Sequence, residues 1–217
     1  SIGSLIGLLY ICGNSPREIL NYFMGINLKT LIKYDFNNSL DSKCILNSDL
    51  FDTLLSFLPD NLITIGDFKN KYNVNIHIHV TNITKNEYEC FSNFTHPDEK
   101  IRDVIKASMS IPGLFKPVEI NGNLYLDGCL KNIYGCPSND IYIKGYSLII
   151  SDTDNSNYLV NIIKSAINND LPRSLYILKF KNNEDSKTTY FNLDKINNKF
   201  TKRLYLKGIK DCMEQIV

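Results

Sequence analysis

The chain has 217 residues, enough for one large domain or two small ones. With 43% hydrophobic residues, 22% charged residues and a formal net charge of +1, the composition is globular and gives no electrostatic reason to expect nucleic acid or an anionic membrane as partner. No apolar run reaches 18 residues and no signal peptide is recognisable, so we expect no transmembrane segment.

The six cysteines are spread along the chain without a C-x-x-C pair. This spacing gives no support for a zinc site and favours free thiols in a reducing compartment. We therefore predict no disulfide, no bound metal and no cofactor. The predicted location is cytoplasmic, with or without peripheral attachment to a membrane.

The chain opens with Ser1-Ile2-Gly3, followed by an apolar segment compatible with a helix. A sharp strand-to-helix turn that presents a nucleophile needs this pattern. The glycine two residues after the nucleophile lets the helix pass close to a sheet, and the helix N-terminus favours developing negative charge. In the nucleophile elbow G-x-S-x-G, Ser1 is the serine, and the first glycine would lie two residues before the chain begins. Ser1 is therefore a candidate nucleophile.

Helix signals dominate the first 72 residues. A capping box at Ser15-Pro16-Arg17-Glu18, with proline at the first helical position, marks one start, and Thr64 marks another. Apolar residues recur at i, i+3, i+4 and i+7 before Pro59, which ends that helix. The predicted helices span about residues 5–11, 16–24, 48–58 and 64–72, with a loop at 26–47.

Strict alternation predicts a strand over residues 74–81, with His77 and His79 on one face. Two histidines on one face suggest a metal site, but no third ligand stands at a fixed spacing. Asn75 and Thr81 continue the same polar face, so we interpret the histidines as part of it. Further strands are predicted at 87–91, 124–128, 147–150 and 175–180, and helices at 95–111, 158–167 and 200–217. This alternation implies a layered α/β domain with a largely parallel sheet.

Asp127 stands at the C-terminal end of a short apolar strand and is followed by Gly128. Active sites of open α/β sheets form at such strand ends. Taken alone, the residue is equally well interpreted as a turn aspartate. No histidine lies in a context that suggests a Ser-His-Asp triad.

The segment 106–118, KASMSIPGLFKPV, and the segment 125–128, YLDG, with Asn132 closely resemble the patatin-like phospholipase family. In that family a helix ending in A-S-x-S-I-P-x-x-F-x-P-V precedes a strand that carries the catalytic aspartate in D-G-G or D-G-A. Segments 1–7, 15–19 and 64–91 resemble the family's elbow, following helices and middle segment. The resemblance covers most of the chain in the right order and weakens after about residue 155.

The resemblance implies a three-layer patatin-like α/β fold with a mainly parallel central sheet, one domain over residues 1–217, and an N-terminal strand unit missing. It implies a dyad in which Ser1 attacks an ester carbonyl and Asp127 takes its proton. The N–H of Ile2 would be one oxyanion donor. The implied substrate is a lipid or phospholipid at a membrane or micelle surface.

Two features depart from the family pattern, and they leave alternatives open. The family's glycine-rich oxyanion loop has no match in the chain, and Cys129 stands where a second glycine or alanine is usual. One alternative is a catalytically inactive patatin-like protein or interaction module. Another is an N-terminal nucleophile hydrolase, in which the α-amine of Ser1 is the base, although this does not explain the Asp127 motif. We expect the 217-residue chain alone to show little activity.

Overall fold

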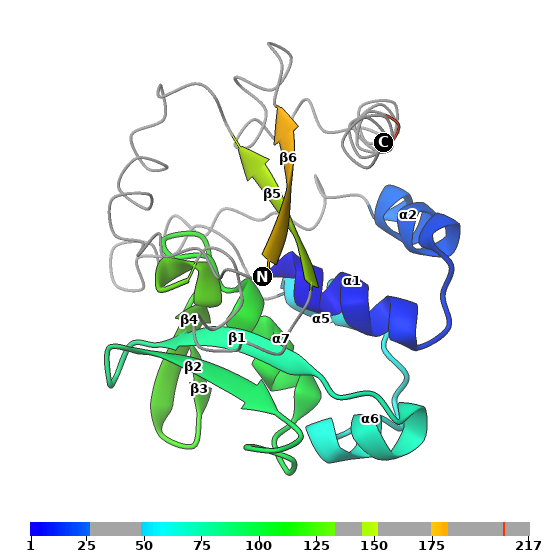
Figure 1. The fold of residues 1–217 in the computed structure, drawn as a ribbon. Helices are drawn as coiled ribbons and strands as arrows, with labels where there is room; N and C mark the ends of the chain where they lie inside the picture. The colour runs from blue at the N-terminus through cyan, green and yellow to red at the C-terminus, as the bar shows by residue number, and fades with distance from the viewer. Residues whose placement is uncertain (27–48, 133–144, 152–174, 182–205, 207–217) are drawn as a thin grey trace. The chain divides into compact units, whose positions relative to one another are not determined.

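The computed structural model describes residues 1–26, 49–132, 145–151, 175–181 and 206 (Figure 1). The chain divides into two compact units, residues 1–131 and 132–217, and each is described by itself. The prediction of a single domain over the whole chain stays a prediction. No helix among the described residues is long and apolar enough to cross a membrane.

Two helices begin the first unit. Helix α1 spans Ile2–Ile11 and α2 spans Pro16–Gly25, close to the predicted positions. The capping box of α2 is formed as predicted: the Ser15 N–H donates to Glu18 Oε2 at 2.7 Å, and the Glu18 N–H donates to Ser15 Oγ at 3.3 Å. Local hydrogen bonds therefore set the start of α2, which is why the sequence alone located it.

The next two helices are α5, Asp49–Leu55, and α6, Ile65–Tyr72. Helix α6 begins with the expected capping box at Thr64. Helix α5 ends at Leu55, earlier than the predicted Leu58. The guanidinium of Arg102 donates to the carbonyl of Leu55 at 2.6 Å and to that of Leu58 at 2.7 Å. A side chain distant in sequence thus satisfies carbonyls that the helix end leaves free.

Four strands form an antiparallel sheet in the order β2-β1-β4-β3. The strands are β1 His77–Asn82, β2 Glu87–Ser92, β3 Val118–Ile120 and β4 Asn123–Asp127. The predicted mainly parallel sheet is therefore not found in this unit. The reason is the short connections: β3 and β4 are joined by Asn121-Gly122, both at positive φ, and a two-residue turn of this kind can only join antiparallel strands.

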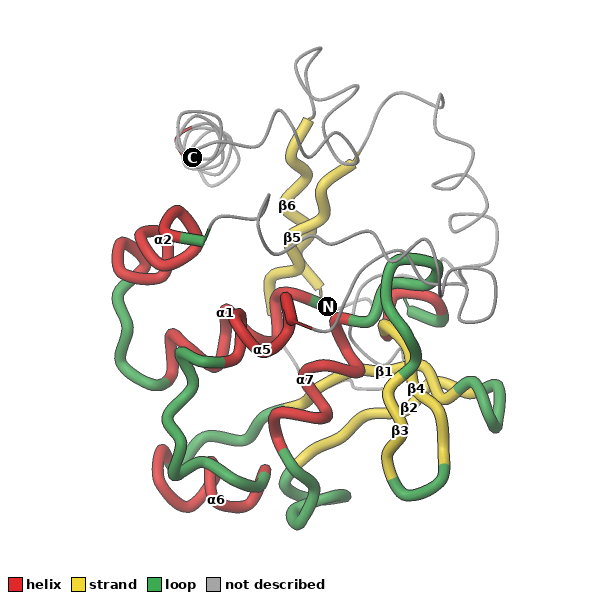
Figure 2. Tube along the Cα trace, turned by 180° about the vertical axis from the view of Figure 1, so that it is seen from behind, coloured by secondary structure: helices red, strands yellow, loops and turns green. Residues whose placement is uncertain are grey.

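Helix α7, Ile101–Met109, lies against β1 and β4 (Figure 2). The prediction that this helix begins near Thr95 is wrong. The preceding segment pairs instead with the start of α6, because the N–H of Ile65 donates to the carbonyl of Glu99 at 3.0 Å and that of Gly66 donates to Pro97 at 2.7 Å. This tertiary pairing takes priority over the helix signal at Thr95.

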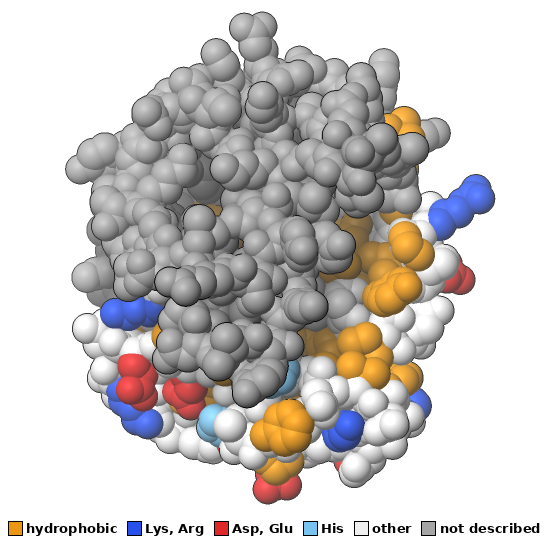
Figure 3. Space-filling view, in the orientation of Figure 1, with side chains coloured by type: hydrophobic (Ala, Val, Ile, Leu, Met, Phe, Trp, Pro, Cys, Tyr) orange, Lys and Arg blue, Asp and Glu red, His pale blue; other side chains and the backbone are white. Residues whose placement is uncertain are grey.

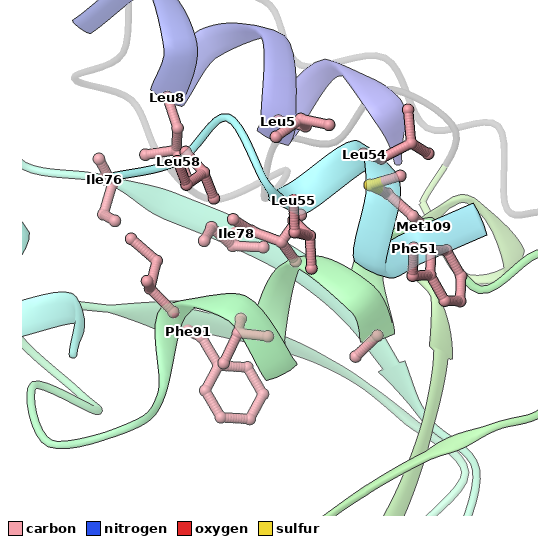
Figure 4. Packing of buried hydrophobic residues seen from close by; sticks show 14 of the residues in the cluster. Leu5, Leu8, Phe51, Leu54, Leu55, Leu58, Ile76, Ile78, Phe91 and Met109 are labelled. Carbon is pink, nitrogen blue, oxygen red and sulfur yellow. The ribbon is translucent and has the colours of Figure 1, made fainter. Parts of the chain in front are cut away.

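The core of the unit lies between α1, α5, α7 and one face of the sheet. Figure 4 shows Leu5 and Leu8 of α1 pointing toward Leu55 and Leu58, with Ile78 of β1 beyond them. All five side chains are buried. Burial of this apolar surface orients the first turn of α1 toward the sheet.

The outer face of α1 is also apolar. Ile2, Ile6 and Tyr10 recur every four residues and are 41%, 41% and 62% exposed. Hydrophobic side chains gather on the surface over the region where α1 lies (Figure 3). Helix α1 is thus hydrophobic on both sides, unlike α2, whose first turn is polar and charged.

In the second unit, β5 Gly145–Ser151 pairs in parallel with β6 Leu175–Lys181. The pairing runs from Gly145 opposite Leu175 to Ser151 opposite Lys181. Both predicted strands are confirmed. The predicted helix at 158–167 lies outside the described residues, as do nearly all of the predicted loop at 26–47 and of the predicted helix at 200–217.

Candidate active site

Asp127 is the last residue of β4 and is completely buried. Its main chain is held on both sides: its N–H donates to the carbonyl of Ser110 at 2.9 Å, and its carbonyl accepts from the Thr81 hydroxyl at 2.9 Å. Its Oδ1 accepts from the N–H of Cys129 at 3.0 Å. The segment after α7, strand β1 and the turn after β4 therefore fix the carboxylate in one orientation.

The second carboxylate oxygen, Oδ2, is buried and has no hydrogen-bond partner among the residues that the structure describes. Buried polar atoms in proteins almost always have such a partner, because leaving one without water or a hydrogen bond costs free energy. Oδ2 of Asp127 therefore has lone pairs that can accept a hydrogen bond or a proton.

Gly128 follows Asp127 and begins the short 3₁₀ helix η1, Gly128–Leu130. A Cβ atom at Gly128 would lie 2.6 Å from the carbonyl oxygen of His79 and 2.7 Å from its carbonyl carbon. Both atoms belong to the main chain of β1 and have little freedom to move. The close approach of two backbones therefore explains why the aspartate is followed by glycine.

Ser1 immediately precedes α1, and its side chain is 49% exposed. Its main-chain nitrogen lies 3.8 Å from Asp127 Oδ1 and 2.7 Å from Ser108 Oγ. The structure thus brings together the two site residues predicted from the sequence, although they are far apart along the chain. They meet where the start of α1, the end of α7 and the end of β4 converge.

Ser108 is a site residue to which the sequence analysis gave no role of its own. It lies on α7 and is 1% exposed, and its hydroxyl donates to the carbonyl of His79 at 2.9 Å. The same oxygen accepts from the nitrogen of Ser1. A signal was present, since Ser108 is the first serine of the A-S-x-S motif, but only the fold shows what it touches.

Cys129 stands beside the carboxylate. Burial raises the pKa of its thiol to about 12, and the negative charge of Asp127 adds to the effect. The thiol interacts with the carboxylate, yet Oδ2 meets no partner at hydrogen-bonding distance and angle among the described residues. Because thiolate is the reactive form, Cys129 is not a reactive nucleophile near neutral pH.

His79 lies next to the site through its main chain, while its imidazole contacts Tyr88. Burial lowers the pKa of His79 to about 4, and the charge of neighbouring His77 adds to the effect. The imidazole is therefore neutral at physiological pH. Nδ1 of His77 lies 3.6 Å from Sγ of Cys90.

No group of three or more histidine, cysteine, aspartate or glutamate side chains is placed to hold a metal ion within the described ranges. None of the described cysteines, Cys12, Cys90 and Cys129, forms a disulfide. The other three cysteines lie outside the described residues, so the prediction of six free thiols stays a prediction.

The first unit is thus a mixed α/β structure in which a serine at a helix start meets a buried aspartate at a strand end. The family model for patatin-like phospholipase matches residues 1–134. The chain belongs to the patatin-like phospholipase family, and the resemblance seen in the motifs is confirmed.

A relative from Invertebrate iridescent virus 6, named "Probable lipid hydrolase 463L", is 30% identical to this chain over 142 residues. The alignment covers 61% of this chain and 48% of the relative. The chain therefore spans about half the length of the curated relative that it matches.

Proposed function

We propose that this chain carries the Ser-Asp dyad of a lipid acyl hydrolase of the phospholipase or lysophospholipase type. Ser1 is the nucleophile and Asp127 is its base. The observation that carries the proposal is the buried carboxylate of Asp127 beside Ser1: one oxygen accepts from a main-chain N–H, and the other has no hydrogen-bond partner among the described residues. A base needs this combination of fixed orientation and a free acceptor.

In the proposed reaction, Oγ of Ser1 attacks the ester carbonyl while the Asp127 carboxylate takes the hydroxyl proton. The C–O bond to the leaving alcohol then breaks, and that alcohol receives the proton from Asp127. The acyl group remains on Ser1 as an ester. Water attacks this acyl-enzyme with Asp127 again as the base, so that a fatty acid is released and the proton returns to Ser1.

The start of α1 supports the developing oxyanion. Ile2 is the first residue of α1, where main-chain N–H groups have no acceptor within the helix. Its N–H follows the nucleophile directly, which is the position of one oxyanion donor in nucleophile elbows. The partial positive charge of the helix N-terminus favours negative charge at the same place.

Labelling with a fluorophosphonate probe, followed by peptide mapping, tests the proposal. The 217-residue chain and the full product of its gene are assayed side by side, with a phospholipid substrate as the second measurement. We expect labelling on Ser1 in the full product and little labelling in the 217-residue chain. In the full product, we expect Ser1→Ala and Asp127→Asn each to lower hydrolysis by a factor of at least about 10³ without loss of fold.

Ser4→Ala is the matched control, because Ser4 is a serine in the first turn of α1 whose hydroxyl, within the described part of the chain, bonds to the Ser1 carbonyl alone, at 2.8 Å. It should retain the label and the activity. Hydrolysis that survives Ser1→Ala would overturn the dyad. A full-length product that is folded, unlabelled and inert would instead identify an inactive member of the family.

A further inference from the structure

Ser108 connects three elements of the site through one oxygen atom. Its hydroxyl donates to the His79 carbonyl on β1 at 2.9 Å and accepts from the Ser1 nitrogen at 2.7 Å. The residue itself lies on α7, one position before the helix ends. The oxygen therefore uses its proton in one direction and a lone pair in the other, so both bonds form together.

Among the described residues, this bridge and the 3.8 Å contact of the Ser1 nitrogen with Asp127 Oδ1 are the polar contacts that join Ser1 to other elements. Its side chain is half exposed, whereas Ser108 and Asp127 are buried. The Ser1 carbonyl accepts from the N–H and the hydroxyl of Ser4, both at 2.8 Å, but Ser4 belongs to the same helix. Those bonds shape the first turn of α1 without attaching it to the sheet.

The strand at the other end of the bridge also sets the position of the base. The His79 carbonyl that receives the Ser108 hydroxyl is the group against which Gly128 packs. One main-chain carbonyl of β1 therefore contacts both the turn that follows Asp127 and the side chain that reaches Ser1. A displacement of Ser108 changes the distance between the two proposed catalytic groups.

We infer that Ser108 is a positioning residue, which holds the first turn of α1, and with it the Ser1 hydroxyl, in register with the carboxylate of Asp127. The inference rests on the proposed function of Ser1 and Asp127. In this structure the donor is the terminal ammonium group of Ser1, and in a longer chain the single amide N–H of Ser1 must take its place. Small displacements of a nucleophile have large kinetic effects, about 10²-fold for 1 Å.

The test compares Ser108→Ala with Ser92→Ala. Ser92 is also a buried serine, at 2% exposure, and its hydroxyl bonds to Thr95 at 2.9 Å. Both variants lose a buried hydroxyl with its hydrogen bonds, but only Ser108 touches Ser1. Urea unfolding of both variants verifies that they are folded under the assay conditions.

Two measurements follow on the full product of the gene. Hydrogen exchange of the Ser4 amide reports whether the first turn of α1 is held, and we expect it to be at least about tenfold faster in Ser108→Ala than in Ser92→Ala. Fluorophosphonate inactivation kinetics report the placement of the nucleophile. We expect the maximal rate to fall about 10- to 100-fold in Ser108→Ala, with little change in the half-saturating concentration.

Faster exchange together with the lower maximal rate supports the positioning role. Unchanged exchange at Ser4 would overturn the bridge, whatever the labelling shows. A maximal rate no lower than that of Ser92→Ala would overturn the kinetic role. A wild-type protein that does not label at Ser1 overturns the proposed function and the positioning role with it. The wild-type measurement alone distinguishes this outcome from a failure of the positioning role.

Discussion

The two sides of the candidate site are held in different ways. Asp127 is completely buried and is fixed through its main chain and one carboxylate oxygen by Ser110, Thr81 and Cys129. Ser1 is half exposed, and the bond from its nitrogen to Ser108 joins it to another element. The proposed base is thus part of the core, whereas the proposed nucleophile stands at its edge.

This difference has a physical basis. A carboxylate that accepts a proton must keep one orientation in a place poor in water, where its hydrogen bonds are strong and its desolvation is costly. A nucleophile must be reached by the substrate, so it cannot be enclosed to the same degree. Substitutions near Asp127 should therefore affect stability, and substitutions near Ser1 should affect mainly kinetics.

The largest expected effect on stability comes from Gly128→Ala. The added Cβ would meet the His79 carbonyl at 2.6 Å, and because the obstacle is main chain, the strand must shift. We expect the free energy of unfolding to fall by about 3 kcal/mol, as overpacking of a tight site does. Urea denaturation followed by circular dichroism measures it.

Gly7→Ala is the control on the other side of the site. Gly7 lies within α1, and among the described residues nothing beyond the adjoining turns of the helix lies within 4 Å of the position of its Cβ. Alanine is the better helix former, so this variant should gain about 0.5–1 kcal/mol. Equal unfolding midpoints for Gly128→Ala and the wild type would contradict the tight packing at the Asp127 turn.

The second effect is a dependence of stability on pH. The pKa of His79 is lowered to about 4 in the folded protein, so the unfolded chain binds a proton at a higher pH than the folded chain. The stabilisation is therefore present above about pH 6.5 and is lost as the pH falls toward 4, by an amount on the order of 2 kcal/mol.

Urea denaturation at several pH values, on the wild type and on His79→Gln, measures this contribution. The variant should lose less stability between pH 6.5 and pH 4 than the wild type. His77→Gln, at an exposed position on the same strand face, removes only the smaller contribution of the neighbouring charge and should keep most of the wild-type dependence. If all three proteins show the same dependence, acid sensitivity in this pH range does not arise from His79.

The smallest effect concerns the hydroxyl that supports the Asp127 main chain. Thr81 is 2% exposed and donates to the Asp127 carbonyl at 2.9 Å. Thr81→Val keeps the shape and removes this bond, and we expect a loss of about 1 kcal/mol in unfolding experiments. Thr53→Val, which removes a bond at the surface of α5, should stay within about 0.5 kcal/mol. Equal losses would show that burial adds nothing to the bond.

The helices illustrate how far local signals reach. The start of α2 was predicted because its determinants, Ser15 and Glu18, are three residues apart and bond to each other. The end of α5 was not predicted correctly, because Arg102 of α7 donates to the carbonyl of Leu55, where the helix ends, and to that of Leu58. A helix end that depends on a distant side chain leaves no local pattern.

The sheet shows the same limit. Alternation located β1 to within a few residues, because it reflects one buried and one polar face. It carries no direction, however, and the expected parallel order came from the alternation of strands and helices. The short turn at Asn121-Gly122 decided for antiparallel pairing of β3 and β4. The short turn at residues 83–86 does the same for β1 and β2, whereas the pairing of β1 with β4 depends on how the segments pack.

By itself the sequence determined the residue types of the candidate site and their family, since Ser1-Ile2-Gly3 and the motifs around Ser108 and Asp127 are contiguous patterns. Only the tertiary structure decided that Ser1 lies beside Asp127, that Ser108 reaches both β1 and Ser1, and that Gly128 must be small because a strand passes against it. The physical reason is that these contacts join segments separated by many residues, and their geometry arises from packing of the shared core.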